Sequence, residues 1–132
     1  MKKIEHIGIA VKNLDTANKL YSKILGIEPY KEEKVDSEGV ITSFFNRNGT
    51  KIELLQGVKK DNSIDKFIEK RGEGIHHIAF EVEDILIEIK RLKKLGFKII
   101  NEQPKKGADN NLIAFIHPKE TNQVLIELCQ KI

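Results

Sequence analysis

Two histidines and two glutamates occupy matching positions in the two halves of this 132-residue chain. His6 and His77 each begin a His-Ile stretch with alternating apolar residues, and Glu53 and Glu127 each lie in an Ile-Glu-Leu sequence. A carboxylate inside an apolar strand is costly to bury without a partner. A divalent cation would remove that cost, because two carboxylates balance its charge and two imidazoles add nitrogen ligands. These four side chains are therefore our candidate metal ligands.

The alternative is a structural role for each residue. A single histidine on a strand usually makes an ordinary hydrogen bond, and a single glutamate usually reaches solvent. The duplication favours the metal site, since four such residues converge if the two sheets close around one cavity. A set of two nitrogen and two oxygen ligands with room for water suits several divalent ions. We expect Co²⁺ first, with Zn²⁺, Ni²⁺ or Mn²⁺ as the alternatives.

His76 and His77 are adjacent, and adjacent side chains on a strand point to opposite faces. His77 is equivalent to His6, and each is followed two positions later by a small residue that leaves room beside the imidazole. We therefore predict that His77 faces the site. His76 is predicted to be structural and to point into or beside the helix layer.

His117 and Cys129 lie near the same strands. His117 precedes Pro118, which favours an extended backbone near a strand end. For His117 a structural role and a substrate contact are both open. Cys129 shares the face of Glu127 by alternation, and we favour a small apolar packing role over a place in the cavity lining.

The elements that position these residues repeat as strand, helix, strand, strand, strand. After the strands that begin at His6 and His77, the apolar residues change to helical spacing. Each helix is predicted to end at a Leu-Gly pair, at Gly26 and Gly96, because glycine adopts the left-handed conformation readily.

The remaining strands of each copy follow the helices. We expect strands to start at Ile27 and at Phe97. The Asn-Gly pair within residues 46–50 predicts a tight hairpin. The corresponding turn of the second copy, at residues 117–123, is predicted to be longer.

Both copies together predict a single α+β domain built from two tandem βαβββ units. The first repeat spans residues 1–57 and the second spans residues 74–132. The joining segment, residues 58–73, is predicted to contain a short helix capped by Asn62 or Ser63.

Composition excludes several functions. The net charge of +3 is too small, and aromatic residues are too few, to indicate a nucleic-acid partner. No apolar run approaches the roughly 18 residues of a membrane span, and the first residues do not form a signal peptide. The single cysteine rules out an internal disulfide and suits the cytoplasm.

Several segments resemble the vicinal oxygen chelate superfamily and, within it, the methylmalonyl-CoA epimerase family. The likeness covers nearly the whole chain and is most specific in "KRGEGIHHIAFEV" and in "HPK" followed by "VLIEL". It implies paired βαβββ units that form a cupped mixed sheet around a divalent metal. It also implies that the metal ligands are His6, Glu53, His77 and Glu127.

The resemblance implies an activity as well, the interconversion of (R)- and (S)-methylmalonyl-CoA through a metal-stabilised enolate. Glu127 is then the candidate base, as a ligand that also reaches the acidic hydrogen. Some relatives carry a second base where this chain has Thr42, so Glu38 or a water molecule would have to replace it. Thr42 and Lys119 are the candidate contacts to the acyl-CoA substrate.

Two other functions are compatible with the same ligands. Glyoxalase I (lactoylglutathione lyase) usually has an arginine four residues after its first histidine ligand, whereas this chain has Ala10. Related folds also serve as non-catalytic metal or small-molecule binding modules. In any of these cases we expect a homodimer, because two βαβββ units leave sheet edges to cover and two-fold pairing is the commonest arrangement.

Overall fold

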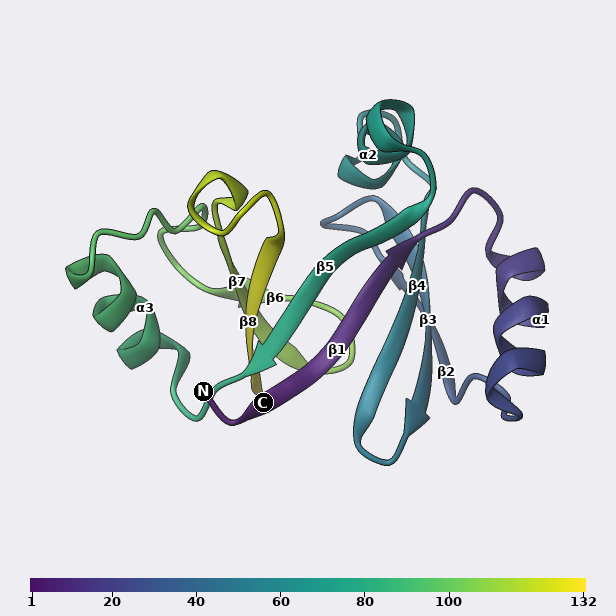
Figure 1. Ribbon diagram of the computed structural model, residues 1–132, viewed down its shortest axis with the longest axis horizontal. Coiled ribbons are helices and arrows are strands. Elements are labelled where there is room, and N and C mark those ends of the chain that lie inside the picture. The colour runs from purple at the N-terminus through teal and green to yellow at the C-terminus, as the bar shows by residue number, and fades with distance from the viewer. The chain divides into compact units, whose positions relative to one another are not determined.

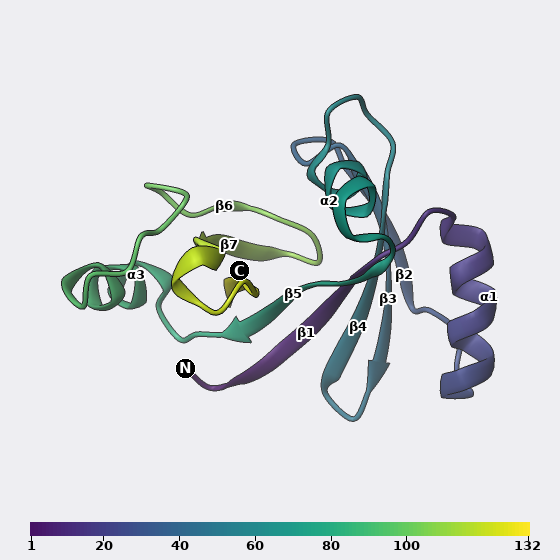
Figure 2. The same ribbon diagram turned by 45° about the horizontal axis from the view of Figure 1, so that its top comes forward.

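Strands and helices alternate along the chain in the predicted βαβββ order (Figures 1 and 2). A computed structural model describes residues 1–132. The first repeat contains β1 (Lys3–Ala10), α1 (Leu14–Leu25), β2 (Lys31–Val35), β3 (Val40–Arg47) and β4 (Thr50–Gly57). The joining helix is α2 (Ser63–Arg71). The second repeat contains β5 (Gly74–Glu81), α3 (Ile85–Lys94), β6 (Lys105–Lys106), β7 (Asn111–Ile116), a 3₁₀ turn (Pro118–Glu120) and β8 (Leu125–Lys131).

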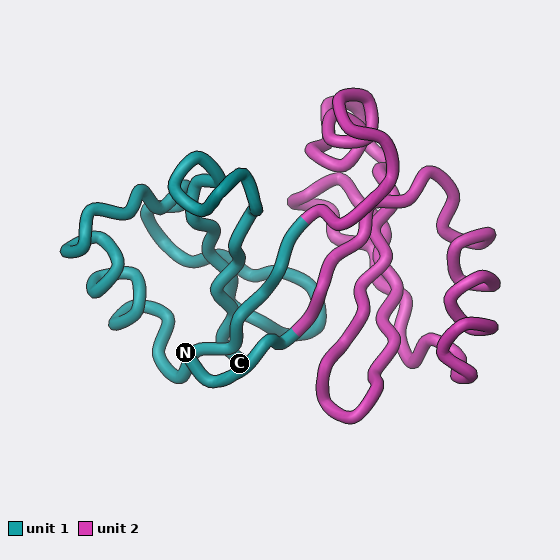
Figure 3. The backbone as a smooth tube through the Cα atoms, in the orientation of Figure 1, with its two compact units in different colours: residues 1–5, 77–132 teal, residues 6–76 magenta.

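The chain forms two compact units, residues 6–76 and residues 1–5 with 77–132 (Figure 3). In the first of these the strand order is β2-β3-β4-β1, with β1 parallel to β4 and the other pairs antiparallel. The other unit has the order β5-β8-β7-β6 with the same directions. The predicted α+β class and repeat are therefore confirmed. The predicted repeat boundaries remain a prediction, because these units divide β1 and β5.

Each unit has its own hydrophobic core beneath its helix. In one unit α1 buries Leu14 and Ala17 against residues of β3 and β4, including Phe45 and Leu54. In the other, the buried residues of the core beneath α3 are Val82, Ile85, Ile89, Leu92, Ile99, Ala114, Ile116 and Leu128. The helices thus cover the aliphatic face of each sheet, as the alternation predicts. None of the helices has the length and apolarity of a membrane-spanning segment.

A glutamine near the end of β4 contacts the start of α1, and a glutamine near the end of β8 contacts the start of α3. The Gln56 side-chain oxygen accepts a hydrogen bond from the Leu14 N–H at 2.7 Å, and Gln130 accepts one from the Ile85 N–H at 2.8 Å. These N–H groups belong to the first helical turn, which has no intrahelical acceptor for them. Because each glutamine lies three residues after a candidate glutamate ligand, the helix start and the ligand-bearing strand are tied together.

The predicted helix ends and hairpin are confirmed. Gly26 and Gly96 have φ angles of 69° and 93°, a region that favours glycine. Between β3 and β4, Asn48 and Gly49 have φ angles of 54° and 94°, as a tight two-residue hairpin requires.

The predicted strand starts at Ile27 and Phe97 are wrong. β2 begins only at Lys31, since Ile27 packs into the core under α1 and Pro29 lacks an N–H for a ladder. The Phe97 N–H donates to the Leu92 carbonyl at the end of α3, so it is not available to a strand. The segment after Phe97 meets β7 at a single bridge, and β6 is limited to Lys105–Lys106.

Candidate metal centre

His6 and Glu53 form a buried pair on two neighbouring parallel strands. Gly8 of β1 is paired with Glu53 of β4. Because Gly8 lies two residues after His6 and has no side chain, it leaves space beside the His6 imidazole on the same face. The His6 Nε2 atom lies 3.3 Å from the Glu53 Oε1 atom, and the side chains are 6% and 5% exposed. The unit of residues 6–76 therefore brings together one predicted nitrogen ligand and one predicted oxygen ligand.

His77 and Glu127 form the equivalent pair in the other unit. Ala79 of β5 lies opposite Glu127 of β8, which is the same register as in the first pair. The His77 Nε2 atom lies 3.6 Å from the Glu127 Oε1 atom, and the side chains are 3% and 6% exposed. We refer to the His6–Glu53 and His77–Glu127 pairs as the two half-sites.

An aromatic ring completes each half-site, and the sequence analysis missed both rings. Phe44 contacts His6 edge-on with ring centroids 6.4 Å apart, and Phe115 contacts His77 with the same separation. Phe44 is paired with Glu53 across β3 and β4, and Phe115 is paired with Glu127 across β7 and β8. The repeat could have predicted these rings, because each phenylalanine lies the same number of residues after the histidine of its own copy. These rings limit the orientation of the imidazoles and exclude water beside them.

Lys51 is a second residue that the sequence analysis missed. It lies opposite His6 in the parallel pairing of β1 and β4 and is 6% exposed. Alternation along β4 places Lys51 on the same face as Glu53, while Ile52 and Leu54 pack beneath α1. The face that carries the first half-site is therefore polar and charged although it is buried.

The donors of each half-site fit a divalent metal ion. Metal bonds of roughly 2.1 Å to nitrogen and oxygen place neighbouring ligand atoms about 3.0–3.4 Å apart in tetrahedral or octahedral geometry. The separation of 3.3 Å in the first half-site is within this range and that of 3.6 Å in the second is slightly above it, whereas an ordinary charge-assisted hydrogen bond is shorter. Buried carboxylates also require a compensating positive charge. The donor set and its burial therefore suit a metal ligand role.

The other two histidines are structural. The His76 ring contacts Phe67 of α2 edge-on at a centroid distance of 5.1 Å, which confirms its predicted place beside a helix. His117 caps the 3₁₀ turn, because its Nδ1 atom accepts a hydrogen bond from the Lys119 N–H at 3.2 Å. This backbone contact favours a structural role for His117 over a substrate contact.

Cys129 has the predicted packing role. It is fully buried and packs with Ala79 and Ile113, next to Phe115. Its Sγ atom lies 3.5 Å from the Phe80 carbonyl oxygen. These side chains form an apolar wall on the face that carries His77 and Glu127.

The candidate substrate contacts lie in different surroundings. Thr42 is 1% exposed and shares its face of β3 with Phe44, and its hydroxyl lies 3.5 Å from the Glu33 carbonyl oxygen. Lys119 is exposed in the turn between β7 and β8. Glu38 lies in the turn before β3, where its N–H donates to the Val35 carbonyl.

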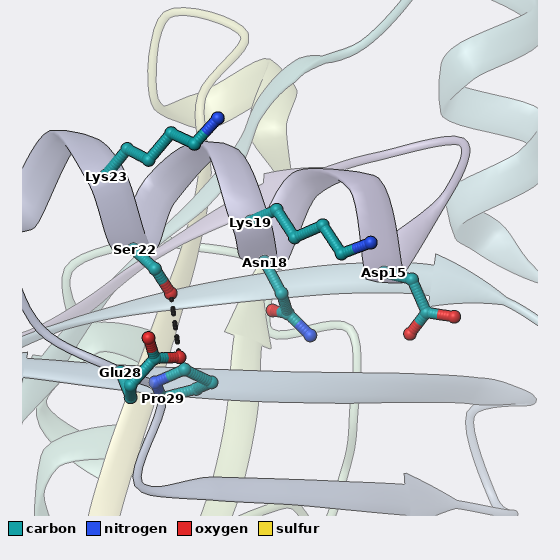
Figure 4. A pocket seen from close by; sticks show the side chains of 7 residues that line it. All are labelled: Asp15, Asn18, Lys19, Ser22, Lys23, Glu28 and Pro29. Atoms are coloured by element: carbon teal, nitrogen blue, oxygen red, sulfur yellow. Dashed lines mark hydrogen bonds between the residues drawn. The ribbon is translucent and has the colours of Figure 1, made fainter.

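A separate surface hollow of about 710 Å³ lies along α1 (Figure 4). The Ser22 hydroxyl lies 3.3 Å from the Glu28 carboxylate inside it. The hollow is on the helix-covered side of the sheet, opposite the face of the first half-site, and it mixes basic and acidic groups. Its lining residues are Asp15, Asn18, Lys19, Ser22, Lys23, Glu28 and Pro29.

Comparison with known proteins identifies the family. Residues 5–115 match the sequence profile of the glyoxalase/bleomycin resistance protein/dioxygenase superfamily. The chain belongs to this superfamily. The predicted family and its fold of tandem βαβββ units are therefore confirmed.

Several members of the superfamily are similar to the chain over nearly its whole length. An ethylmalonyl-CoA/methylmalonyl-CoA epimerase of Cereibacter sphaeroides is 39% identical over 130 residues, which cover 97% of each chain. The crystal structure of methylmalonyl-CoA epimerase from Mycobacterium tuberculosis matches with a TM-score of 0.94 and 35% identity, covering 98% of this chain and 88% of that one. A methylmalonyl-CoA epimerase in complex with methylmalonyl-CoA and NH₄⁺ also matches with a TM-score of 0.94, at 30% identity, covering 99% and 95%.

Proposed function

We propose that this chain is a metal-dependent methylmalonyl-CoA epimerase, which interconverts the (R) and (S) epimers. The observation that carries the proposal is the pair of buried half-sites in a chain that is 39% identical to an epimerase over 97% of its length. The half-sites supply the ligands, and the similarity to epimerases selects the substrate among the reactions of the superfamily.

Both half-sites together would hold one divalent ion, with His6, Glu53, His77 and Glu127 as its protein ligands. Two nitrogen and two carboxylate oxygen donors suit Co²⁺, Zn²⁺, Ni²⁺ and Mn²⁺, among which affinity and availability decide, and Co²⁺ is our first candidate. When bound, the ion would supply the positive charge that stabilises a developing enolate. The equivalence of the two half-sites in register and burial supports a shared ion.

Glu127 would act as the base that removes the hydrogen from C2 of the substrate. This hydrogen is acidic because C2 lies between a thioester and a carboxylate. The Glu127 carboxylate is 6% exposed and is paired across the sheet with Phe115, beside the apolar wall of Ile113 and Cys129. These surroundings limit the access of water without preventing it, so the carboxylate takes the substrate proton directly and can still exchange that proton with solvent. A positioned base of this kind contributes roughly 10²–10⁴-fold to the rate.

Thr42 and Lys119 are proposed as substrate contacts. Thr42 lies on the face of β3 that carries Phe44. It is two residues before Phe44, which is the residue paired with Glu53 of β4. Its hydroxyl can donate a hydrogen bond to an acyl oxygen. Lys119 is exposed and has an ammonium group suited to a phosphate of coenzyme A.

The proposed enzyme is a cytoplasmic homodimer. Its single cysteine is buried, so the chain contains no internal disulfide, as suits a reducing compartment. Exposed apolar side chains on α1, Leu20 and Ile24, which are 54% and 65% exposed, support burial against a second copy.

Incubation with methylmalonyl-CoA in D₂O tests the proposed function. The metal-loaded protein should invert C2 and replace its hydrogen with deuterium, which proton NMR detects directly. A parallel incubation with glutathione and methylglyoxal should give no lactoylglutathione. Formation of lactoylglutathione without exchange at C2 would identify a glyoxalase I instead, and no reaction in either arm would favour a binding module.

A further inference from the structure

We infer that Glu33 of β2 is the second proton-transfer residue of the site. The inference rests on the proposed epimerase function. Inversion requires that a proton leave one face of C2 and that another arrive on the opposite face. Glu127 serves one face, so a second group must serve the other.

The strand pairing places Glu33 on the face of the first half-site. Glu33 of β2 is paired with Thr42 of β3, and in the next row Phe44 of β3 is paired with Glu53 of β4. Directly paired residues on neighbouring strands point to the same face, and so do residues two apart on one strand. Glu33, Thr42, Phe44 and Glu53 therefore share one face.

The spacing within this face leaves room for the acyl group. Strands lie about 4.8 Å apart and residues two apart on a strand are separated by about 6.8 Å, so the Glu33 and Glu53 backbones are about 12 Å apart. Both side chains extend over the same face of the sheet. A small acyl group held beside Glu53 is then within reach of the Glu33 carboxylate.

Neighbouring contacts hold Glu33 in place. The Lys31 Nζ atom lies 3.3 Å from the Glu33 Oε1 atom, and the two side chains are 34% and 30% exposed. At the start of β2, the Tyr30 N–H donates to the Phe44 carbonyl, and the Tyr30 and Phe44 rings are in contact at 6.1 Å. The carboxylate is thus oriented by an ammonium group and is still open enough to exchange its proton with water.

Other groups in this part of the unit are less suitable. The Thr42 hydroxyl is a poor base. Glu38 lies in the turn beyond Val40, so it is farther along the sheet from Glu53 than Glu33 is. Glu32 is paired with Ser43, whose hydroxyl contacts Asn18 of α1, and therefore points to the helix-covered face.

Inversion moves one proton from C2 to one glutamate and a second proton from the other glutamate to C2. In one direction the Glu127 carboxylate takes the proton from C2, and the electrons of the broken C–H bond remain in the enolate. Glu33, as a carboxylic acid, delivers its proton to the other face and forms the new C–H bond. In the reverse direction the two residues exchange roles, and each exchanges its proton with water between turnovers.

Glu33→Gln tests the inference, with Glu32→Gln as the matched control on the opposite face of β2. In D₂O, Glu33→Gln should lose inversion by at least about 10²-fold, as loss of a positioned proton donor predicts. One epimer should still exchange its C2 hydrogen with retention, because Glu127 alone can remove a proton and return a deuteron. Glu32→Gln should invert within about twofold of the unchanged protein, and neither variant should change metal content or the unfolding temperature.

A rescue variant separates proton transfer from packing. Thr42→Glu places a carboxylate on the same face, one strand closer to Glu53, and should restore inversion to Glu33→Gln by at least tenfold. Inversion by Glu33→Gln within about threefold of the unchanged protein would overturn the inference. Failure of the unchanged, metal-loaded protein to invert methylmalonyl-CoA would instead overturn the proposed function on which the inference rests.

Discussion

The four histidines of this chain differ in what their imidazoles contact. His76 meets an aromatic ring of α2, and His117 accepts a backbone N–H. His6 and His77 instead lie within 3.6 Å of buried carboxylates. Sequence alternation separated His76 from His77 correctly, because it depends only on the strand conformation of β5.

His77→Ala should abolish tight metal binding, whereas His76→Ala should leave it intact. The first change removes a proposed ligand, so the loss of affinity should exceed the roughly 10–100-fold typical of groups that only support a ligand. The second removes only the contact with Phe67. Metal content after dialysis and equilibrium titration measure the difference. Similar behaviour of the two variants would contradict the assignment of faces.

Glu127→Gln should lose inversion, and should lose C2 exchange of the epimer whose hydrogen faces Glu127, even when it is fully metal-loaded. The amide keeps an oxygen donor for the metal, but it cannot accept the substrate proton. We expect a loss of roughly 10²–10⁴-fold in exchange followed by NMR. Glu102→Gln, at an exposed position of the same unit, is the control and should retain full exchange. A metal-loaded Glu127→Gln protein that exchanges normally would show that Glu127 is a ligand only.

At the scale of elements, the sequence predicts periodicity better than register. The helices, the Asn48–Gly49 hairpin and the faces of β1 and β5 follow from local patterns, and the structure has them. The start of β2 does not, because core packing of Ile27 and the missing N–H of Pro29 delay the strand. The pairing of Glu33 with Thr42 is set by the turn between Val35 and Val40, and because the sequence prediction assigned no turn there, it did not place Glu33 on the candidate face.

The cap of α2 allows a graded test of local stability. The Asn62 side chain is 4% exposed, accepts a hydrogen bond from the Asp65 N–H and donates to the Lys59 carbonyl. Asn62→Ala should therefore lower the free energy of unfolding by about 2 kcal/mol, at the upper end for a lost cap. Asn13→Ala removes an exposed cap with one such bond, to Thr16, and should lower it by about 1 kcal/mol. Chemical denaturation measures both, and equal effects would mean that burial of the Asn62 bonds adds nothing.

At the scale of the whole molecule, internal duplication made the fold predictable. Each copy confirms the interpretation of the other, so ambiguous apolar runs could be assigned by comparison. The same comparison predicts His6, Glu53, His77 and Glu127 as ligands, but it does not predict Phe44 and Phe115. Phenylalanine is an ordinary core residue, so the equal spacing of the two rings from their histidines gains meaning only when the strand pairing places each ring beside a histidine and a glutamate.

Sedimentation equilibrium should give the mass of a dimer. The physical reason is that Leu20 and Ile24 expose apolar surface on α1 that a second copy can bury. Replacing both residues with lysine should weaken the association of the two copies. C2 exchange by the resulting monomer is the control, because it shows whether the substitutions have disturbed the active site. A monomer mass at every concentration would contradict the proposed homodimer.

We propose that the two half-sites bind one ion and that this ion is required for epimerisation. The most direct test of this proposal is a titration of the metal-depleted protein with Co²⁺ while the inversion of methylmalonyl-CoA is followed. We expect no inversion at the start, a linear rise, and a plateau at one equivalent of Co²⁺ per chain. A plateau at two equivalents, inversion that does not depend on the ion, or no inversion at any Co²⁺ concentration would contradict the proposal.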